Sequence, residues 1–339
     1  MTTRTRYFVI VSLLVLAVGL GTGLVAYYVG FPTSAFTRQG GPDELQYVPK
    51  DAAVLAFADV HDVMTSELRR KLREAAPVPE NGQREFQERT GINIETDIDR
   101  VVACLDPESA GDNRNGGMVL ARGRFDEVRI ESLIREHGGR EEEYHGKRLL
   151  VVTTGHDMGD RSRDTDGSHE MALTFIEPGL IAVGSPSLVR NAVDLQHGGA
   201  SVTGNTELMK LVRSLDDGNA WAVGRFDALQ RSARLPEGVA SQLPAITWFS
   251  VSSHIDGGIR GVLRAEARDE AAANNLRDVV RGFLALARMQ SGSRPELQAV
   301  MQSLQLGGTG DTVALSFDLP SDVFDLLRHA APSGRGDRR

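Results

Sequence analysis

Short apolar runs, each followed by a segment with apolar residues on one helical face, recur along most of the chain. A short apolar run is typical of a strand, and apolar residues spaced by three and four are typical of an amphipathic helix. This pattern predicts strands over residues 53–59, 117–125, 180–184, 219–226, 259–267 and 312–319. A helix is predicted after each of these strands.

The clearest strand covers residues 259–267, where apolar and polar residues alternate. Alternation indicates an antiparallel strand with one face toward a core and the other toward water. Asp269 then caps a long predicted helix. We expect the inner face of this helix to hold Leu276, Val279, Val280, Phe283 and Leu284.

The strand-then-helix units look repeated. The tetrapeptide Gly-Arg-Phe-Asp occurs at 123–126 and again at 224–227, each time ending a predicted strand and opening a predicted helix. It indicates an internal duplication, with chance recurrence of a common junction as the alternative. Strands mixed with amphipathic helices predict an α+β fold of antiparallel sheets covered by helices. We therefore expect two halves, 51–200 and 201–331, and a flexible tail over 332–339.

The N-terminal region predicts a membrane location. Residues 7–28 carry no charged side chain, and about 20 residues at 1.5 Å rise cross a ~30 Å hydrocarbon core. Arg4 and Arg6 precede this run, so the positive-inside rule places the N-terminus in the cytoplasm. Residues 1–30 thus predict an uncleaved signal anchor that contacts the lipid of the inner membrane. A linker over 31–50 then leads to a periplasmic, extracytoplasmic domain. A cleaved signal peptide is the alternative, although its apolar core would be shorter.

Small residues form one stripe along the predicted span: Gly19, Gly23, Ala26 and Gly30. In lipid, close backbone approach over such a stripe favours helix pairing. The stripe therefore predicts a homodimer or a contact with a membrane-complex partner. The alternative is that these are the ordinary glycines of a membrane helix.

Charge and cysteine content exclude several classes of protein. The 339 residues include 46 acidic and 38 basic side chains, for a formal net charge of −8. Nucleic-acid binding needs a basic surface, so we expect no nucleic-acid partner. Cys104 is the single cysteine, which excludes an intramolecular disulfide and cysteine-rich zinc sites. We expect it to be a small buried apolar residue.

No metal-binding or cofactor motif is complete. His169 and Glu170 begin an HExxH pattern, but Leu173 stands where the second histidine should be. Glu141, Glu143 and His145 alternate and would share one face of a strand; a solvated strand face is the preferred interpretation of these three. Glycine-rich nucleotide loops are absent. We therefore expect no metal-binding or cofactor-binding residues.

Nucleophilic catalysis has no better support in the sequence. Ser252, His254 and Asp256 follow the residue types of a catalytic triad. Side chains two residues apart on a strand point in parallel about 7 Å apart, so the required hydrogen bonds cannot both form. A polar sheet face explains the three residues, and we expect no catalytic residues.

Two stretches resemble a known family. Residues 47–54 (YVPKDAAV) and 182–193 (AVGSPSLVRNAV) are similar to segments of an uncharacterised family of N-terminally anchored extracytoplasmic bacterial proteins. The resemblance implies an anchored α+β ectodomain and supplies no catalytic residues.

The leading hypothesis from the sequence is a non-enzymatic, membrane-anchored binding or scaffold module of the cell envelope. An accessory subunit of a membrane complex is the second hypothesis. The third is an envelope hydrolase or metalloenzyme that uses histidine and acidic residues near 137–170.

Overall fold

The computed structural model describes residues 41–75, 81–106, 116–154, 169–233, 245–291 and 295–320. The predicted anchor over 7–28, with Gly19, Gly23, Ala26 and Gly30, lies outside the described residues, and so do the predicted final helix and tail beyond residue 320. Within the described ranges, none of the helices combines the length and the apolar character that a bilayer crossing requires.

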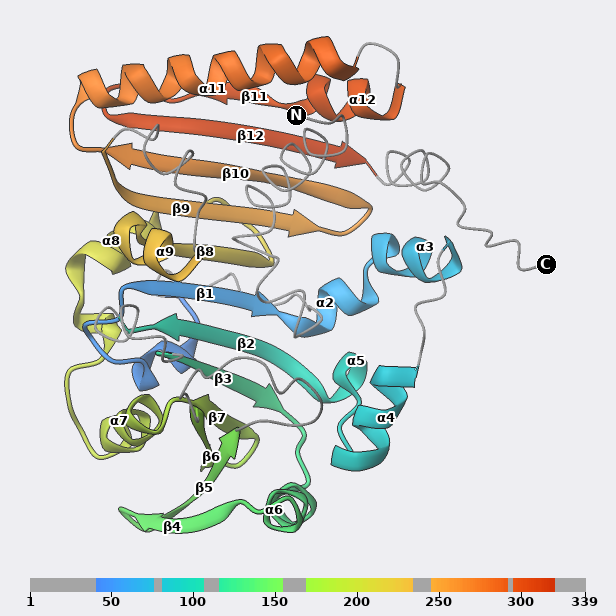
Figure 1. The fold of residues 1–339 in the computed structure, drawn as a ribbon, viewed down its shortest axis with the longest axis vertical. Coiled ribbons are helices and arrows are strands. Elements are labelled where there is room, and N and C mark those ends of the chain that lie inside the picture. The colour runs from blue at the N-terminus through green and yellow to red at the C-terminus, as the bar shows by residue number, and fades with distance from the viewer. Residues whose placement is uncertain are drawn as a thin grey trace, which may run out of the picture.

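One antiparallel sheet of twelve strands forms the framework of the molecule (Figure 1), in the order β11-β12-β10-β9-β8-β1-β2-β3-β7-β6-β5-β4. The α+β prediction is confirmed, but the strands form one continuous sheet where we expected more than one. The strands are β1 (Val54–Asp59), β2 (Ile98–Leu105), β3 (Gly117–Gly123), β4 (Arg140–Tyr144), β5 (Lys147–Thr154), β6 (His169–Glu177), β7 (Leu180–Gly184), β8 (Ala220–Arg225), β9 (Ile246–Ile255), β10 (Gly258–Ala267), β11 (Gln305–Gly307) and β12 (Thr312–Pro320).

The two halves of the chain meet at the centre of this sheet, where β1 pairs with β8. Moving outward from that pair, one side runs β1-β2-β3-β7-β6-β5-β4 and the other runs β8-β9-β10-β12-β11. In both directions, three strands consecutive in the chain are followed by strands in reverse order, four on the first side and two on the second. The central pair is close-packed, because Ala56 faces Ala222 across it.

Helices cover the two faces of the sheet. They are η1 (Asp43–Tyr47), α2 (Val60–Thr65), α3 (Glu67–Ala75), α4 (Asn81–Thr90), α5 (Ile94–Asp97), α6 (Glu127–Glu136), α7 (Pro186–Gln196), η3 (Val202–Gly204), α8 (Thr206–Arg213), α9 (Phe226–Ala233), α11 (Glu270–Ser291) and α12 (Pro295–Ser303). Strand residues alternate between faces. Phe57 and Trp221 therefore pack with α7 and α8 on one face, whereas Ala222 and Val251 pack with α9 on the other.

Part of the predicted linker over 31–50 belongs to the core, which corrects that prediction. Leu45, Tyr47 and Val48 are buried and pack with the largest hydrophobic cluster. The backbone continues the attachment, because Val202 donates a hydrogen bond to the carbonyl oxygen of Val48 at 2.8 Å. The buried segment contains only the short 3-10 helix η1, which is too short to show a helical period. The proline and glycine residues around it therefore led to the prediction of a linker.

Candidate functional site

Ser252, His254 and Asp256 do not form a catalytic arrangement. Ser252 and His254 lie on β9, whereas Asp256 follows the end of that strand. Ser252 is buried, and no hydrogen bond with a described residue reaches its hydroxyl oxygen. The backbone carbonyl of Asp256 accepts a hydrogen bond from Leu68 at 2.7 Å, which ties the β9–β10 turn to α3. The three residues are thus part of a sheet face and its turn.

Glu141, Glu143 and His145 are not brought together either. Only the two glutamates lie in β4, and His145 occupies the following turn with a φ of 48°. The carboxylate of Glu141 accepts hydrogen bonds from Arg135, at 2.9 Å for Nη2. The shared strand face that the alternation predicted therefore ends before the histidine.

Cys104 lies in β2 and is buried, as predicted. Burial raises the pKa of its thiol to about 12. The thiolate is the reactive form of cysteine, so this side chain acts as an apolar residue of the core.

A cluster of charged residues fastens η1 to the sheet. Arg122 donates hydrogen bonds to the carboxylates of Glu44 and Glu177, each at 2.5 Å. Arg100 lies 3.7 Å from Glu44, and the hydroxyl of Tyr47 donates to Glu177 at 3.0 Å. The hydrogen bond from Arg122 lowers the pKa of Glu177, and burial raises that of Tyr47. Glu44 is only 1% exposed, and the cluster joins η1 to strands β2, β3 and β6.

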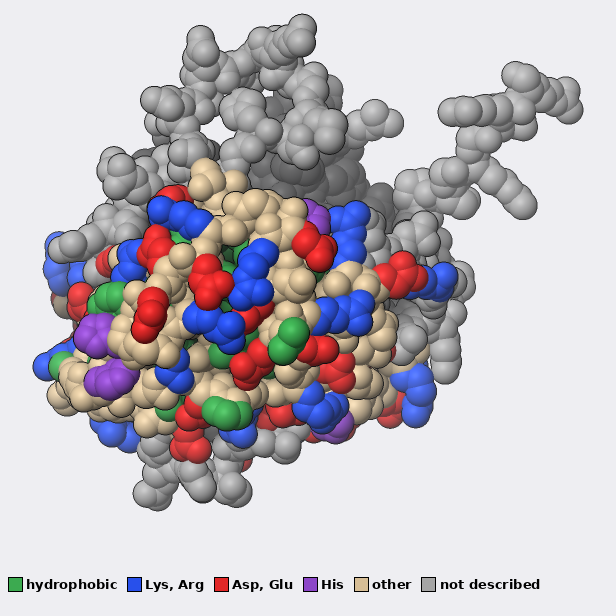
Figure 2. Space-filling model, turned by 90° about the horizontal axis from the view of Figure 1, so that it is seen from below, with side chains coloured by type: hydrophobic (Ala, Val, Ile, Leu, Met, Phe, Trp, Pro, Cys, Tyr) green, Lys and Arg blue, Asp and Glu red, His purple; other side chains and the backbone are tan. Residues whose placement is uncertain are grey.

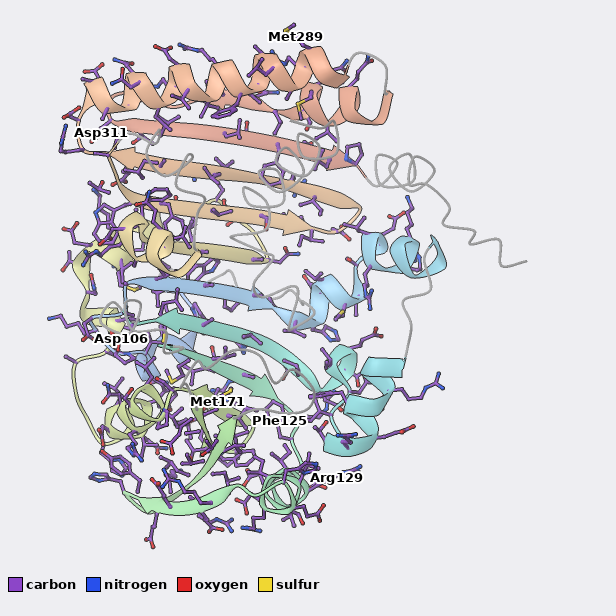
Figure 3. All side chains as sticks on the ribbon, in the orientation of Figure 1. Asp106, Phe125, Arg129, Met171, Met289 and Asp311 are labelled. Carbon is purple, nitrogen blue, oxygen red and sulfur yellow. The ribbon has the colours of Figure 1, made fainter. Side chains whose placement is uncertain are left out.

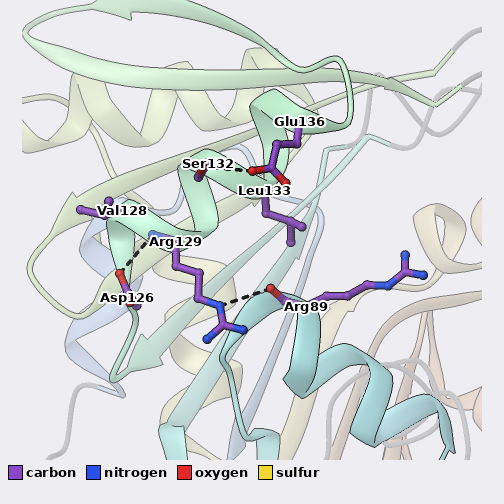
Figure 4. Close-up of a pocket in the computed structure, with 7 residues that line it drawn as sticks. All are labelled: Arg89, Asp126, Val128, Arg129, Ser132, Leu133 and Glu136. Carbon is purple, nitrogen blue, oxygen red and sulfur yellow. Dashed lines mark hydrogen bonds between the residues drawn. The ribbon is translucent and has the colours of Figure 1, made fainter.

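An open hollow of about 450 Å³ separates α4 from α6 (Figure 4). Its lining consists of Arg89, Asp126, Val128, Arg129, Ser132, Leu133 and Glu136. The guanidinium of Arg129 crosses it and donates to the backbone carbonyls of Glu88 and Arg89 at the end of α4. The carbonyl oxygens at the end of α4 thus already bind the guanidinium of Arg129. The hollow is therefore a contact between α4 and α6.

The β4 end of the sheet is strongly charged. Figure 2, which looks onto this end, shows acidic and basic side chains intermixed with few apolar ones. Arg140 pairs with Glu142 and Glu170 at 3.1 Å, and Arg190 pairs with Glu142 at 2.6 Å. A charged edge strand opposes pairing with strands of other molecules. This end is therefore unsuited to association through the sheet.

Helix α11 presents the opposite character. Leu286 is 55% exposed and Met289 is 80% exposed, and Figure 3 shows Met289 pointing away from the sheet. They belong to a row of residues on the outer flank of the helix: Asn275, Val279, Gly282, Leu286 and Met289. Their spacing of four, three, four and three is that of a seam in a coiled coil. We call this row the α11 seam.

The described residues pack against the inner face of α11 and leave the α11 seam exposed. Leu276 and Val280 pack on the sheet with the alanines that precede them. Two residues that we expected on the inner face lie elsewhere: Phe283 is 44% exposed at the border of the seam, and Val279 belongs to the seam and is partly exposed. The sequence already contained this spacing, but a helix rich in apolar residues does not show which of two adjacent faces is buried.

Comparisons with known proteins leave the family open. No protein-family model matches the chain, and no curated protein matches it. Among solved structures, the chain is similar to TP0453 in its crystal form I, with 10% sequence identity and a TM-score of 0.43. That match covers 86% of this chain and 99% of the other. The resemblance of residues 47–54 and 182–193 to an anchored uncharacterised family stays a prediction.

Proposed function

We propose that the chain is a non-enzymatic, membrane-anchored protein of the cell envelope, whose duplicated α+β domain acts as a scaffold through the α11 seam. The apolar run over residues 7–28 supports the anchor, with the N-terminus inside and the domain in the periplasm. The order of the first five strands is the same on the two sides of the β1–β8 junction, which supports the duplication. The exposed seam is the observation that carries the scaffold role.

The seam fits a helix better than a flat surface, and we propose a second copy of α11 as its partner. A period of 3.5 residues lets two helices interlock along a common line. At Gly282, no described atom lies within 4 Å of the place where a Cβ would stand, so another backbone can approach closely. Beside the seam, Asp278 and Arg281 form an ion pair with each other at 2.9 Å, so neither charge is left unpaired next to the contact.

The predicted anchor supports the same pairing. Two copies that associate through Gly19, Gly23, Ala26 and Gly30 would hold their domains at high effective concentration. The contact between two α11 seams, which is short, could then form even if it were too weak to hold two separate domains together. The accessory-subunit hypothesis uses the same seam but places a helix of another envelope protein on it.

Cysteine crosslinking in membranes tests this proposal. Met289→Cys in the full-length chain should give a covalent dimer on mild oxidation, because the seam brings the two copies of residue 289 into one interface. Val128→Cys is the matched control, because Val128 is equally exposed, at 78%, but lies on α6. Leu286→Asp should remove the Met289→Cys crosslink, since it places charges in the seam. Equal crosslinking from positions 128 and 289 would refute the pairing. A monomer that co-purifies with another protein through Leu286 would favour the accessory-subunit hypothesis.

A further inference from the structure

Two histidines and one carboxylate meet where the β4–β5 turn lies against the end of α7. The imidazole centres of His145 and His197 are 5.6 Å apart. The Nε2 atom of His145 is 3.7 Å from the Oδ1 atom of Asp194. Asp194 and His197 are three residues apart and so lie on the same side of the helix end. The group therefore combines one side chain from the hairpin with two from the C-terminal end of α7, where His197 is the first residue beyond the helix.

The spacing of these groups is close to that of ligands around one metal ion. Zinc binds imidazole nitrogen at about 2.0–2.1 Å, which puts two coordinating ring centres about 5.2 Å apart at the tetrahedral angle. Nitrogen and oxygen ligands on such an ion are separated by about 3.4 Å. As placed, no group of three histidine, cysteine or acidic side chains among the described residues is arranged to hold an ion. The two separations from His145, to the His197 ring and to the Asp194 carboxylate, differ from the coordinating ones by less than half an ångström.

The surrounding hydrogen bonds prepare two of the three side chains for this role. The Nδ1 atom of His197 lies 3.1 Å from the carbonyl oxygen of Val193 and donates to it, which leaves the Nε2 lone pair for a ligand. The Tyr144 hydroxyl is 3.0 Å from both carboxylate oxygens of Asp194 and donates a hydrogen bond to that carboxylate. Histidine bonded to a backbone carbonyl, and a carboxylate held by a neighbour, are the usual supports of metal ligands.

The backbone at His145 is a further, independent feature. His145 has a φ of 48° and Gly146 a φ of 73°, and they connect the paired residues Tyr144 and Lys147. Two-residue hairpin turns with both φ values positive favour Asn-Gly or Asp-Gly. Histidine is therefore a costlier choice than asparagine at this turn, and it places an imidazole beside α7. Its side chain is 55% exposed and that of Asp194 is 42% exposed, so an ion can reach both from solvent.

We propose that His145, Asp194 and His197 bind a divalent transition-metal ion of the zinc class. Imidazole and carboxylate ligands suit zinc, nickel and copper. A bound ion would clamp the β4–β5 hairpin to the end of α7, with water in the fourth position. The site stands apart from the α11 seam and does not depend on it.

Zinc titration calorimetry on the full-length chain in detergent, prepared without a polyhistidine tag, tests the site. The wild-type chain should bind one Zn²⁺. His145→Asn, Asp194→Asn and His197→Gln should each weaken binding at least tenfold, and Tyr144→Phe should weaken it by about 10- to 100-fold through the lost support. His145→Asn should leave the metal-free melting temperature unchanged or higher, because asparagine suits the turn.

His137→Asn supplies the control. The Nδ1 atom of His137 makes the same bond to the helix end of α6, at 2.8 Å from the Leu133 carbonyl oxygen, so its replacement removes a similar imidazole from a different place. Zinc affinity should be unchanged in this variant. Absence of zinc binding by the wild-type chain would overturn the proposal. So would zinc binding that survives both His145→Asn and His197→Gln.

Discussion

Replacing Arg122 with methionine should strongly destabilise the fold, because it leaves the buried carboxylate of Glu44 without its nearest cation. Glu44 would keep only Arg100, at 3.7 Å, and its Oε2 atom already has no hydrogen-bond partner among the described residues. Removing one partner of a buried ion pair costs about 3–5 kcal/mol. Arg122 is itself 24% exposed, so we expect about 3 kcal/mol, near the lower end of that range.

The double variant Glu44→Met, Arg122→Met distinguishes this reasoning from simple loss of packing. With both charges gone, the buried carboxylate no longer needs a partner, and stability should return to within about 1 kcal/mol of the wild-type value. Urea unfolding, followed through the fluorescence of the buried Trp221, gives these free energies. Arg225→Met is the control: its ion pair with Asp227 is exposed on both sides, so we expect a loss below about 1 kcal/mol. A double variant no more stable than Arg122→Met would refute the argument.

Three further predictions follow from the packing of single residues. Leu45→Ala should cost about 2–5 kcal/mol in urea unfolding, because Leu45 is fully buried; a loss below about 0.5 kcal/mol would show that η1 is not part of the core. The pKa of Glu177 is depressed from its ordinary 4.5, so its contribution is present above that pH and is lost as the pH falls through the folded pKa. The wild-type chain should therefore lose more stability on acidification than Glu177→Gln does, and equal losses would contradict this. Asp269→Ala should cost about 1 kcal/mol, because Asp269 Oδ1 accepts from the Ala272 backbone at 2.8 Å; an unchanged urea midpoint would contradict the capping role.

Most of the correctly predicted elements came from hydrophobic patterns with a fixed period. The expected strand over 180–184 is β7 to the residue, and alternation over 259–267 gives β10 almost unchanged. These signals succeed because one buried face forces a period of two on a strand. The cap at Asp269 was equally readable, since an aspartate just before a helical pattern has a local mechanism.

Features that depend on contacts between residues distant in the sequence could not be predicted from it. The attachment of Leu45 and Val48 needs partners from α7 and η3, more than a hundred residues away. The cluster of His145 with His197 joins residues 52 apart in the sequence. Neither has a local period. The α11 seam differs, because its spacing is local and only its exposure needed the structure.

The strand order also changes the argument for an internal duplication. The first Gly-Arg-Phe-Asp begins at the last residue of β3, the third strand outward from the centre, whereas the second begins inside β8, the central strand of the other half. The two tetrapeptides therefore stand at positions that do not correspond. The stronger correspondence is topological: β3 pairs with β7 as β10 pairs with β12, and each inner strand is followed by a helix before the chain returns. The β1–β8 pair joins one edge of each half, and β4 and β11 remain as the outer edges of the sheet. Each half thus covers an edge of the other that would otherwise be unpaired, which accounts for a single sheet where the sequence pattern suggested two.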